Sequence, residues 1–211
     1  MLETMVKPRQ DLVTVNEDTT LSEALMLLED FNFRALPILD ASGQLFRGVI
    51  YKMHLYKHKA NNGDMQQPVT SVMRNTTKFI NSDATFFDLT FAIRDLPFIS
   101  VLDAENHFTG IITYSHYMRL LEDSWRPNDG KTVMTLKSTG GRGNLERASK
   151  IMARYTNILS VVTLNTDHGP GRIIATIPTS VDDSTLNKIT RALQRKDFEI
   201  ESIESYRRPS A

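Results

Sequence analysis

The chain contains an internal repeat, and this repeat narrows the folds that are open to it. Gly110–Tyr117 reads GIITYSHY, and sixty-two positions earlier Gly48–Leu55 reads GVIYKMHL. In both segments aliphatic residues follow the glycine, and histidine stands in the seventh position. A repeat unit of about sixty residues is too long for a solenoid, and two copies are too few. We therefore predict that the two copies pack against each other as a pair.

The match extends upstream of these segments. Asn16–Leu21 is echoed by Asn81–Phe86 at an offset of sixty-five, and Ile38–Asp40 by Val101–Asp103 at sixty-three. The offset shrinks smoothly along the repeat. This indicates one supersecondary unit that was duplicated and then shortened in its connections.

Apolar periodicity predicts the same elements in each copy. The first copy is expected to contain a strand at 12–15, a capped helix from 21, a buried strand at 35–39, a turn at 40–43, a strand at 45–50 and a helix from 52. The second is expected to contain strands at 79–80, 98–102 and 108–112 and helices at 86–93 and 114–121. The inward face of the first helix is predicted to be Leu21, Ala24, Leu25, Leu28 and Phe31 in the first copy. In the second copy it is predicted to be Phe87, Thr90 and Phe91.

This order of elements resembles the CBS domain, a module named after cystathionine β-synthase. The resemblance is carried by Leu36–Gly43, LPILDASG, and by the glycine-led ending of each copy. It implies a tandem pair, with a first domain at 1–62 and a second at 63–125.

The last third of the chain has a different pattern. Strands are expected at 132–137, 158–166, 172–179 and 199–206, and helices at 145–155 and 182–196, with Leu145 on the inner face of the first helix. The order βαββαβ is that of a ferredoxin-like fold. Together with a glycine-rich loop after the first strand, it resembles an ACT domain at 131–208.

The fold class expected for the whole chain is therefore α/β (α+β), a tandem CBS pair followed by a ferredoxin-like, ACT-like domain. In this order the chain resembles small bacterial regulatory proteins. They include the acetoin-utilisation CBS–ACT proteins and the cyclic di-AMP-binding CBS proteins of Gram-positive bacteria.

The CBS resemblance implies a nucleotide site built from both copies. Its candidate residues lie at the starts of strands and at the strand-to-helix junctions: Leu12, Val13, Ala35, Leu36, Pro37, Tyr51, Lys52, His54, Phe79, Ile80, Phe98, Ile99, Thr113, Tyr114, His116 and Arg119. Flat apolar walls and free backbone groups suit an adenine ring. Buried strands carry apolar residues at the same positions without any ligand, so the pattern leaves both interpretations open.

The two junctions depart from the pattern of AMP- and ATP-binding CBS domains. Where the resemblance places an aspartate on the ribose hydroxyls, this chain has His54 and His116. A neutral imidazole offers one donor and one acceptor, whereas a carboxylate bridges two hydroxyls. A doubly anionic cyclic dinucleotide tolerates that loss, and it favours Lys52, both histidines and Arg119 as neighbours. The alternative is that both histidines cap a helix or face solvent in sites that have degenerated.

The glycine-rich loop is the second candidate site. Gly140, Gly141, Arg142, Gly143 and Asn144 precede a predicted helix. Successive backbone N–H groups there are able to hold a carboxylate or phosphate at the helix N-terminus. In ACT domains, as the resemblance implies, the equivalent loop binds an amino acid at a subunit interface. The alternative is a plain flexible turn.

Composition argues against several classes of protein. Lysine plus arginine (25) balances aspartate plus glutamate (25), so no net field draws the chain to nucleic acid or to an anionic membrane. There is no cysteine, and no apolar run approaches the roughly twenty residues of a membrane span. The first residues lack the pattern of a signal peptide, and we expect a cytoplasmic protein.

Motifs for catalysis are also missing. The sequence has no Gly-x-Ser-x-Gly and no His-Glu-x-x-His. His54 and His58 stand four positions apart, a spacing compatible with a metal, but exposed helix surface is the favoured interpretation. We expect no enzyme activity, no metal and no cofactor other than a regulatory nucleotide.

These patterns predict a non-enzymatic sensor that binds an adenine nucleotide, cyclic di-AMP before AMP or ATP, and passes its state to an unidentified protein partner. A homodimer is expected through the helix faces at Leu55–Tyr56 and Tyr117–Leu121, because CBS pairs join through their helices, as the resemblance implies. Three alternatives stay open: an interaction scaffold without ligand, an amino-acid sensor acting through the ACT-like domain, and an adjunct subunit of a metabolic enzyme.

Overall fold

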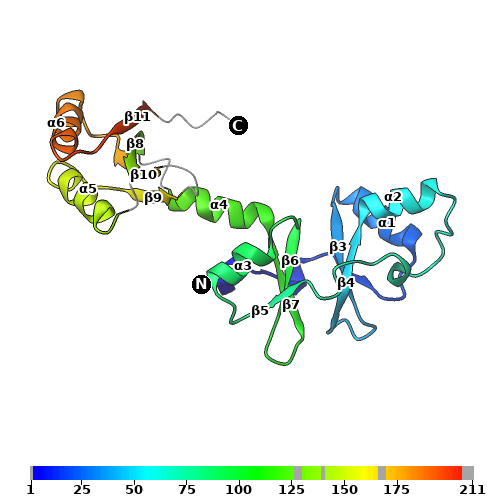
Figure 1. Ribbon diagram of the computed structural model, residues 1–211. Coiled ribbons are helices and arrows are strands. Elements are labelled where there is room, and N and C mark those ends of the chain that lie inside the picture. Colours follow the sequence, from blue (N-terminus) through cyan, green and yellow to red (C-terminus); the bar gives the residue numbers. More distant parts are fainter. Residues whose placement is uncertain (1, 126–129, 139–140, 166–169, 206–211) are drawn as a thin grey trace. The chain divides into compact units, whose positions relative to one another are not determined.

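The computed structural model describes residues 2–125, 130–138, 141–165 and 170–205. The chain forms two compact units, Met1–Met118 and Arg119–Ala211 (Figure 1). Within the described parts, none of the helices has the length and apolar character that crossing a bilayer requires. The domain boundaries at 62 and 125 stay predictions.

The first copy of the repeat is a three-stranded sheet with two helices. Its elements are β2 (Val15–Asn16), α1 (Leu21–Asp30), β3 (Ala35–Leu39), β4 (Phe46–Tyr51) and α2 (Lys52–Ala60), and β3 lies between β2, which is parallel to it, and β4, which is antiparallel. The predicted inward face of α1 is confirmed for Leu21, Ala24, Leu25 and Leu28, which are all buried in one cluster. Phe31 was wrong, because it is the C-cap residue of α1 and is exposed. The predicted strand at 12–15 was wrong except at Val15, since residues 12–14 belong to no strand and β2 begins at Val15.

The second copy repeats this arrangement and gains a strand from the N-terminus. Its sheet has the order β1-β7-β6-β5, and its elements are β1 (Lys7–Pro8), β5 (Phe79–Asn81), α3 (Phe86–Ala92), β6 (Phe98–Leu102), β7 (Phe108–Thr113) and α4 (Tyr114–Ser124), which continues into the second unit. Short 3-10 turns lie at Leu2–Met5, Arg9–Asp11 and Val69–Ser71. The sheet of the second copy is therefore completed by a segment that precedes the first copy.

Both copies start their first helix with the same cap. The Thr20 hydroxyl accepts a hydrogen bond from the Glu23 N–H, and the Glu23 carboxylate accepts one from the Thr20 N–H at 2.9 Å. Thr85 and Asp88 repeat this reciprocal capping box in α3. Because the cap fixes where each helix begins, it also fixes which residues of the helix face the core.

In α3 the residues that face the core differ from those predicted. Phe87 and Phe91 were expected to point inward, but they are 70% and 73% exposed, and Leu89 and Ile93 are buried instead. Thr90 is half-buried and accepts a hydrogen bond from the Tyr117 hydroxyl at 3.0 Å. The second copy therefore presents two phenyl rings on the outer face of its first helix.

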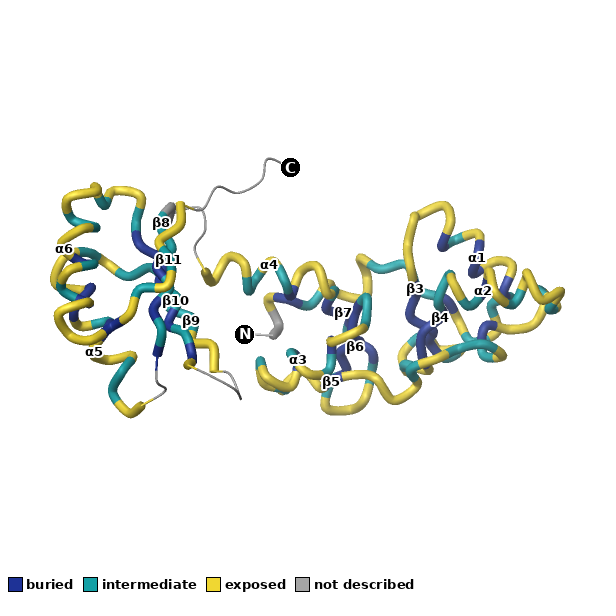
Figure 2. Tube along the Cα trace, turned by 45° about the horizontal axis from the view of Figure 1, so that its top comes forward, coloured by how far each residue is buried: buried dark blue, intermediate teal, exposed yellow. Residues whose placement is uncertain are grey.

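The two copies pack against each other through one apolar group, which we call the inter-copy cluster: Ala35, Leu39, Val49, Phe98, Leu102, Phe108 and Ile111, with Leu12, Phe46 and Tyr51 half-buried against it. Figure 2 shows the buried residues concentrated on β3, β4, β6 and β7. The rings of Phe46 and Phe108 stack with centroids 6.1 Å apart. The predicted packing of the copies as a pair is confirmed.

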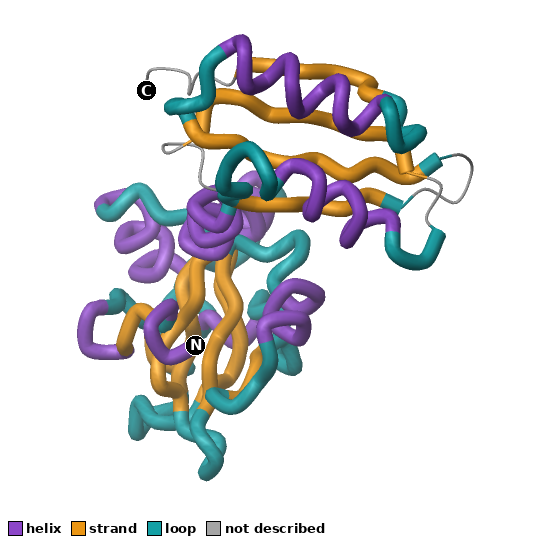
Figure 3. Tube along the Cα trace, turned by 90° about the vertical axis from the view of Figure 1, so that its left-hand side faces the viewer, coloured by secondary structure: helices purple, strands orange, loops and turns teal. Residues whose placement is uncertain are grey.

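The second unit has the predicted βαββαβ order. Its elements are β8 (Gly130–Ser138), α5 (Asn144–Met152), β9 (Ser160–Leu164), β10 (Gly171–Pro178), α6 (Asp183–Gln194) and β11 (Ile200–Ser205), in an antiparallel sheet of order β11-β8-β10-β9. Both helices pack on one face of this sheet (Figure 3), where Met134, Leu136, Ile173, Ile189 and Leu193 form the centre of the core. The ferredoxin-like fold is confirmed. Leu145 was predicted to face inward, but it lies in the first turn of α5 and is exposed.

Candidate functional site

The junction between β4 and α2 in the first copy brings three polar side chains together. The Tyr51 hydroxyl accepts a hydrogen bond from the side-chain amide of Asn75, and the Tyr51 ring packs against the inter-copy cluster. Burial raises the pKa of Tyr51, and the hydrogen bond from Asn75 acts in the opposite direction. The imidazole of His54 lies edge-on to the Tyr51 ring, with centroids 5.4 Å apart. These groups give the rim of the cluster both a donor and an acceptor.

His54 has an unusual environment for a histidine on a helix. Its Nδ1 is buried and has no hydrogen-bond partner among the described residues. A buried polar atom without a partner costs about 1–3 kcal/mol, so such an atom calls for an explanation. The cap predicted as the alternative role of His54 is not seen, because Tyr51, the N-cap residue of α2, makes no side-chain cap bond and the Nδ1 stays unpaired.

The side chain of Lys52 contacts α1 and Tyr56 instead of Tyr51 and His54. Its ammonium donates to the Leu28 carbonyl at 3.3 Å and lies 6.0 Å from the centroid of the Tyr56 ring. Leu28 stands in the last turn of α1, where a cation is favoured by the helix dipole. Lys52 therefore stabilises the end of α1 in this arrangement.

The junction between β7 and α4 in the second copy is more open. The Thr113 hydroxyl accepts a hydrogen bond from the His116 N–H at 3.2 Å and lies 3.2 Å from the Ser115 hydroxyl. The side chains of Tyr114 and His116 are exposed. Arg119 is exposed on α4 and belongs to the second unit. The two histidines are thus not equivalent, since His54 is half-buried and His116 faces solvent.

The predicted apolar walls divide between two places. Leu12, Ala35 and Tyr51 from the first copy meet Phe98 from the second in the inter-copy cluster. Val13 and Leu36 instead belong to the core of the first copy. The remaining predicted residues of the strands are buried, namely Pro37, Ile80 and Ile99, or exposed, namely Phe79.

Two polar residues of the first unit, Asn75 and Ser100, were missed by sequence reasoning. Asn75 holds Tyr51 from the connection between the copies, in a left-handed conformation with φ of 56°. Ser100 lies in the centre of β6, 1% exposed, and its hydroxyl has no hydrogen-bond partner among the described residues. A serine inside the apolar run FISVL was a signal for the second of these, whereas nothing local marked Asn75.

The glycine-rich loop of the second unit borders a small cavity. Gly143 adopts φ of +84° as the N-cap residue of α5, and Arg142 is exposed. The cavity has a volume of about 120 Å³ and is lined by Ser138, Gly141, Asn144, Leu145, Thr163, Asn165, Arg172 and Ile173. Gly140 lies outside the described residues. A larger hollow of about 450 Å³ at Gln194–Ile200 contains none of the predicted residues.

Arg172 gives this cavity its charge. Its guanidinium makes two hydrogen bonds to the Glu201 carboxylate, at 2.8 and 2.9 Å, and a third to the Pro170 carbonyl at 3.0 Å. The pairing raises the pKa of Arg172 and lowers the pKa of Glu201. Its positive charge is therefore matched within the unit.

Comparison with known proteins supports the assignment of the first copy. Residues 4–61 match the family model of the CBS domain. This part of the chain is thus similar to the CBS domain. Because residues 79–124 repeat the same elements in the same order and pack against it, the two copies form a CBS pair in fold.

Solved structures of CBS proteins share this fold. CbpB in complex with c-di-AMP is 20% identical, with a TM-score of 0.52, and the match covers 58% of this chain and 84% of that one. A CBS domain protein from Streptococcus pneumoniae is 22% identical, with a TM-score of 0.52 over 58% and 86% of the two chains. CBSX2 in complex with AMP is 21% identical, with a TM-score of 0.51 over 57% and 94%. No curated relative matches the sequence.

Proposed function

We propose that this protein is a regulatory sensor whose CBS pair binds an adenine nucleotide, with cyclic di-AMP as the first candidate, and that it has no catalytic role of its own. The observation that carries the proposal is the meeting of Leu12, Ala35 and Tyr51 from one copy with Phe98 from the other. Four residues chosen from sequence as one ligand site therefore lie in one cluster.

The side chains at the edge of the inter-copy cluster are suited to bind an adenine ring. Apolar and aromatic side chains offer surfaces for stacking, and the Tyr51 hydroxyl and the unpaired Nδ1 of His54 offer polar contacts beside them. A ligand group that hydrogen-bonds Nδ1 removes the cost of that buried atom, which adds to its affinity.

The junction residues favour a phosphodiester over a nucleotide that depends on ribose recognition. Both junctions carry histidine where a carboxylate would hold the ribose hydroxyls. Removing two negative charges lowers the repulsion of phosphate groups, and a protonated imidazole attracts them. The solved structures support the same class of ligand, since CbpB holds c-di-AMP and CBSX2 holds AMP on this fold.

Signalling would work by a shift of population. α2 starts directly after Tyr51, so a ligand at the rim acts on a residue that also sets the position of a helix. Ligand binding would favour one arrangement of the copies, and a partner protein would recognise that arrangement. A differential affinity of about 1–3 kcal/mol between the two arrangements is sufficient for regulation.

A homodimer is part of the proposal, but its predicted faces need correction. Leu55 and Tyr117 are buried inside the first unit, so they are not free to contact a second chain, whereas Tyr56 is 41% exposed and stays available. The outer faces of the helices instead carry Met53 on α2 and Phe87 and Phe91 on α3. We expect these exposed apolar side chains to mediate the dimer. Sedimentation analysis of the Phe91→Ser variant tests this, and an unchanged dimer would exclude α3 from the interface.

The decisive experiment is calorimetric titration of the full chain with cyclic di-AMP, AMP, ATP and cyclic di-GMP. We expect saturable binding of cyclic di-AMP, an affinity at least tenfold lower in the His54→Ala variant, and an unchanged affinity in the Lys59→Ala variant, whose side chain is exposed on the same helix. Equal affinity in the wild type and His54→Ala would refute the proposed site. If none of the four nucleotides bound, the remaining functions would be an interaction scaffold or an adjunct subunit of an enzyme.

A second candidate rests on the cavity beside the glycine-rich loop. A cavity of about 120 Å³ is smaller than ordinary drug-sized sites of about 300–1,000 Å³, and it suits a small molecule such as an amino acid. The side chain of Asn144 lies in its lining, 3.5 Å from the Ser138 hydroxyl. Binding of an amino acid that is lost in Asn144→Ala but kept in His54→Ala would establish this function in place of the first.

A further inference from the structure

The turn between β6 and β7 contains three side chains with metal-binding atoms. Asp103, Glu105 and His107 each offer one such atom, and these atoms all lie within 4.8 Å of one another. We propose that this turn binds a divalent transition-metal ion, with Zn²⁺ as the first candidate. The site is separate from the nucleotide site and does not depend on the function proposed above.

The spacing of two of these ligand atoms fits a bound zinc ion. His107 Nδ1 lies 3.5 Å from Asp103 Oδ2, which is longer than an ordinary N–H···O hydrogen bond of about 2.7–3.2 Å. Two ligands at about 2.1 Å from zinc in tetrahedral geometry lie about 3.4 Å from each other. The imidazole and the carboxylate are therefore already separated as two ligands of one ion would be.

The other oxygen of Asp103 fixes the carboxylate in this orientation. Its Oδ1 accepts hydrogen bonds from the N–H of Glu105 at 3.0 Å and from the N–H of His107 at 2.7 Å. This leaves Oδ2 directed toward the imidazole. In metal sites, hydrogen bonds that orient a ligating carboxylate raise the affinity for the ion.

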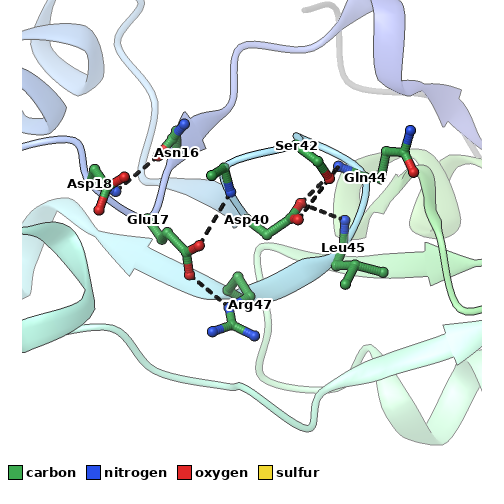
Figure 4. A network of polar contacts seen from close by, with 9 residues as sticks. Asn16, Glu17, Asp18, Asp40, Ser42, Gln44, Leu45 and Arg47 are labelled. Carbon is green, nitrogen blue, oxygen red and sulfur yellow. Dashed lines mark hydrogen bonds and ion pairs between the residues drawn. The ribbon is translucent and has the colours of Figure 1, made fainter.

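The first copy provides an internal comparison. In its equivalent turn, Asp40 Oδ1 also accepts two backbone hydrogen bonds, from Gln44 and Leu45, both at 2.8 Å. There, however, Oδ2 accepts a hydrogen bond from the Ser42 hydroxyl at 2.7 Å, so the carboxylate is satisfied within the turn (Figure 4). Ser42 corresponds to Glu105 at an offset of sixty-three. The second turn is one residue shorter, so Leu45 corresponds to His107, because the carbonyls of these two residues accept the hydrogen bonds from the Asp40 and Asp103 N–H groups.

The two turns thus share the aspartate that begins them and the hydrogen bond that closes them, and they differ in length by one residue and in their side chains. The second copy has lost the hydroxyl that closes the turn on itself and has a carboxylate and an imidazole at the two positions that flank Oδ2. All three side chains are partly or fully accessible, so an ion can enter without unfolding. One imidazole and two carboxylates favour zinc, nickel or cobalt over magnesium and calcium, which prefer oxygen ligands alone.

The position of the turn gives the ion a structural consequence. His107 forms an isolated bridge with Leu45, and the Phe108 N–H donates to the Gln44 carbonyl at 2.7 Å. These contacts join the turn of the second copy to the turn of the first. An ion that rigidifies residues 103–107 would therefore strengthen the contact between the copies.

The test is titration of the full, chelator-treated chain with Zn²⁺ by calorimetry and with Co²⁺ by visible absorption. We expect one ion per chain, with intense d–d bands for Co²⁺, and no comparable heat from Mg²⁺. The His107→Gln and Glu105→Ala variants should each weaken binding at least tenfold. The His58→Gln variant is the matched control and should bind as the wild type does.

Several outcomes would overturn this site. Zinc binding that survives His107→Gln, or that is lost in His58→Gln, would place the ion at another histidine. Absence of binding in the wild type at micromolar ion would also refute it. Thermal unfolding without metal shows whether each variant is folded, and Glu105→Ala keeps the test valid if His107→Gln is not, because Glu105 is exposed and its side chain makes no hydrogen bond within the described chain.

Discussion

Gly110 lies directly against the carbonyl oxygen of Lys7, which a β-carbon at Gly110 would approach to 2.2 Å. The N-terminal strand β1 is hydrogen-bonded to β7 at this point, with Pro8 opposite Gly110. The glycine that begins GIITYSHY is thus required because another strand passes over it. In the first copy Gly48 has the same relation to the Arg74 carbonyl, at a less severe 2.9 Å.

We therefore expect Gly110→Ala to destabilise the first unit by about 1–3 kcal/mol, the range for overpacking at a closely packed position. Gly48→Ala should have a smaller effect in the same direction. Urea unfolding followed by far-UV circular dichroism measures the loss. The single tryptophan, Trp125, belongs to the second unit, and its fluorescence transition should not move. If the urea unfolding of the first unit were the same in Gly110→Ala as in the wild type, β1 would not be paired with β7 in solution.

The unpaired hydroxyl of Ser100 leads to the opposite expectation. A buried polar group without a partner is unfavourable, so its replacement by an apolar group of similar size should be neutral or stabilising. We expect Ser100→Ala to leave the free energy of unfolding unchanged or to raise it by about 1 kcal/mol. A loss of more than about 1 kcal/mol in the same urea experiment would mean that the hydroxyl has a partner in solution.

The features that sequence predicted well depend on local chemistry. The cap predicted before the helix that begins at Leu21 is the box at Thr20, which involves residues three positions apart, and such a contact follows from spacing alone. The buried strand Ala35–Leu39 was marked by a continuous apolar run, and Phe98–Leu102 by a run that only Ser100 interrupts. The order of elements in both units followed from the same local patterns.

The features that sequence missed depend on segments that meet only in the folded chain. Phe91 was placed inside because it shares a helical face with Phe87 and Thr90, but Leu89 is the residue buried in this helix. The contact of Asn75 with Tyr51 and the pairing of Lys7 with Ile111 join positions far apart in the chain. No spacing in the sequence encodes these distances, and so Asn75 was not among the predicted residues of the candidate site.

Asp40 makes the stability of the first unit sensitive to acid. The Ser42 hydroxyl and the backbone N–H groups of the turn lower the pKa of Asp40 from 3.8 to about 2. A carboxyl whose pKa is lowered on folding stabilises the protein above its unfolded pKa, and that contribution is lost as the pH falls toward the folded value. Asp40→Asn should therefore flatten the decline in stability between about pH 4 and pH 2.

Unfolding by urea at several pH values measures this slope. Asp103→Asn is the matched control, because it alters the equivalent turn without removing the Asp40–Ser42 contact. If Asp40→Asn left the acid slope as steep as in the wild type, the hydrogen bonds of this turn would not persist in solution.

Variants of Tyr51 and Asn75 test whether the Tyr51 hydroxyl, beside the inter-copy cluster, makes a hydrogen bond to the nucleotide. If the Tyr51 hydroxyl donates to a phosphate or to the edge of adenine, Tyr51→Phe should lower the affinity for cyclic di-AMP about tenfold, since a hydrogen bond to a charged group contributes about 1.5–3 kcal/mol. Asn75→Ala, which removes only the group that orients the hydroxyl, should have a weaker effect. Tyr56→Phe is the control, because the Tyr56 hydroxyl donates to Glu29 at 2.8 Å on the surface of the same domain. Equal affinities for Tyr51→Phe and Tyr56→Phe would show that the nucleotide, if bound, does not use this hydroxyl.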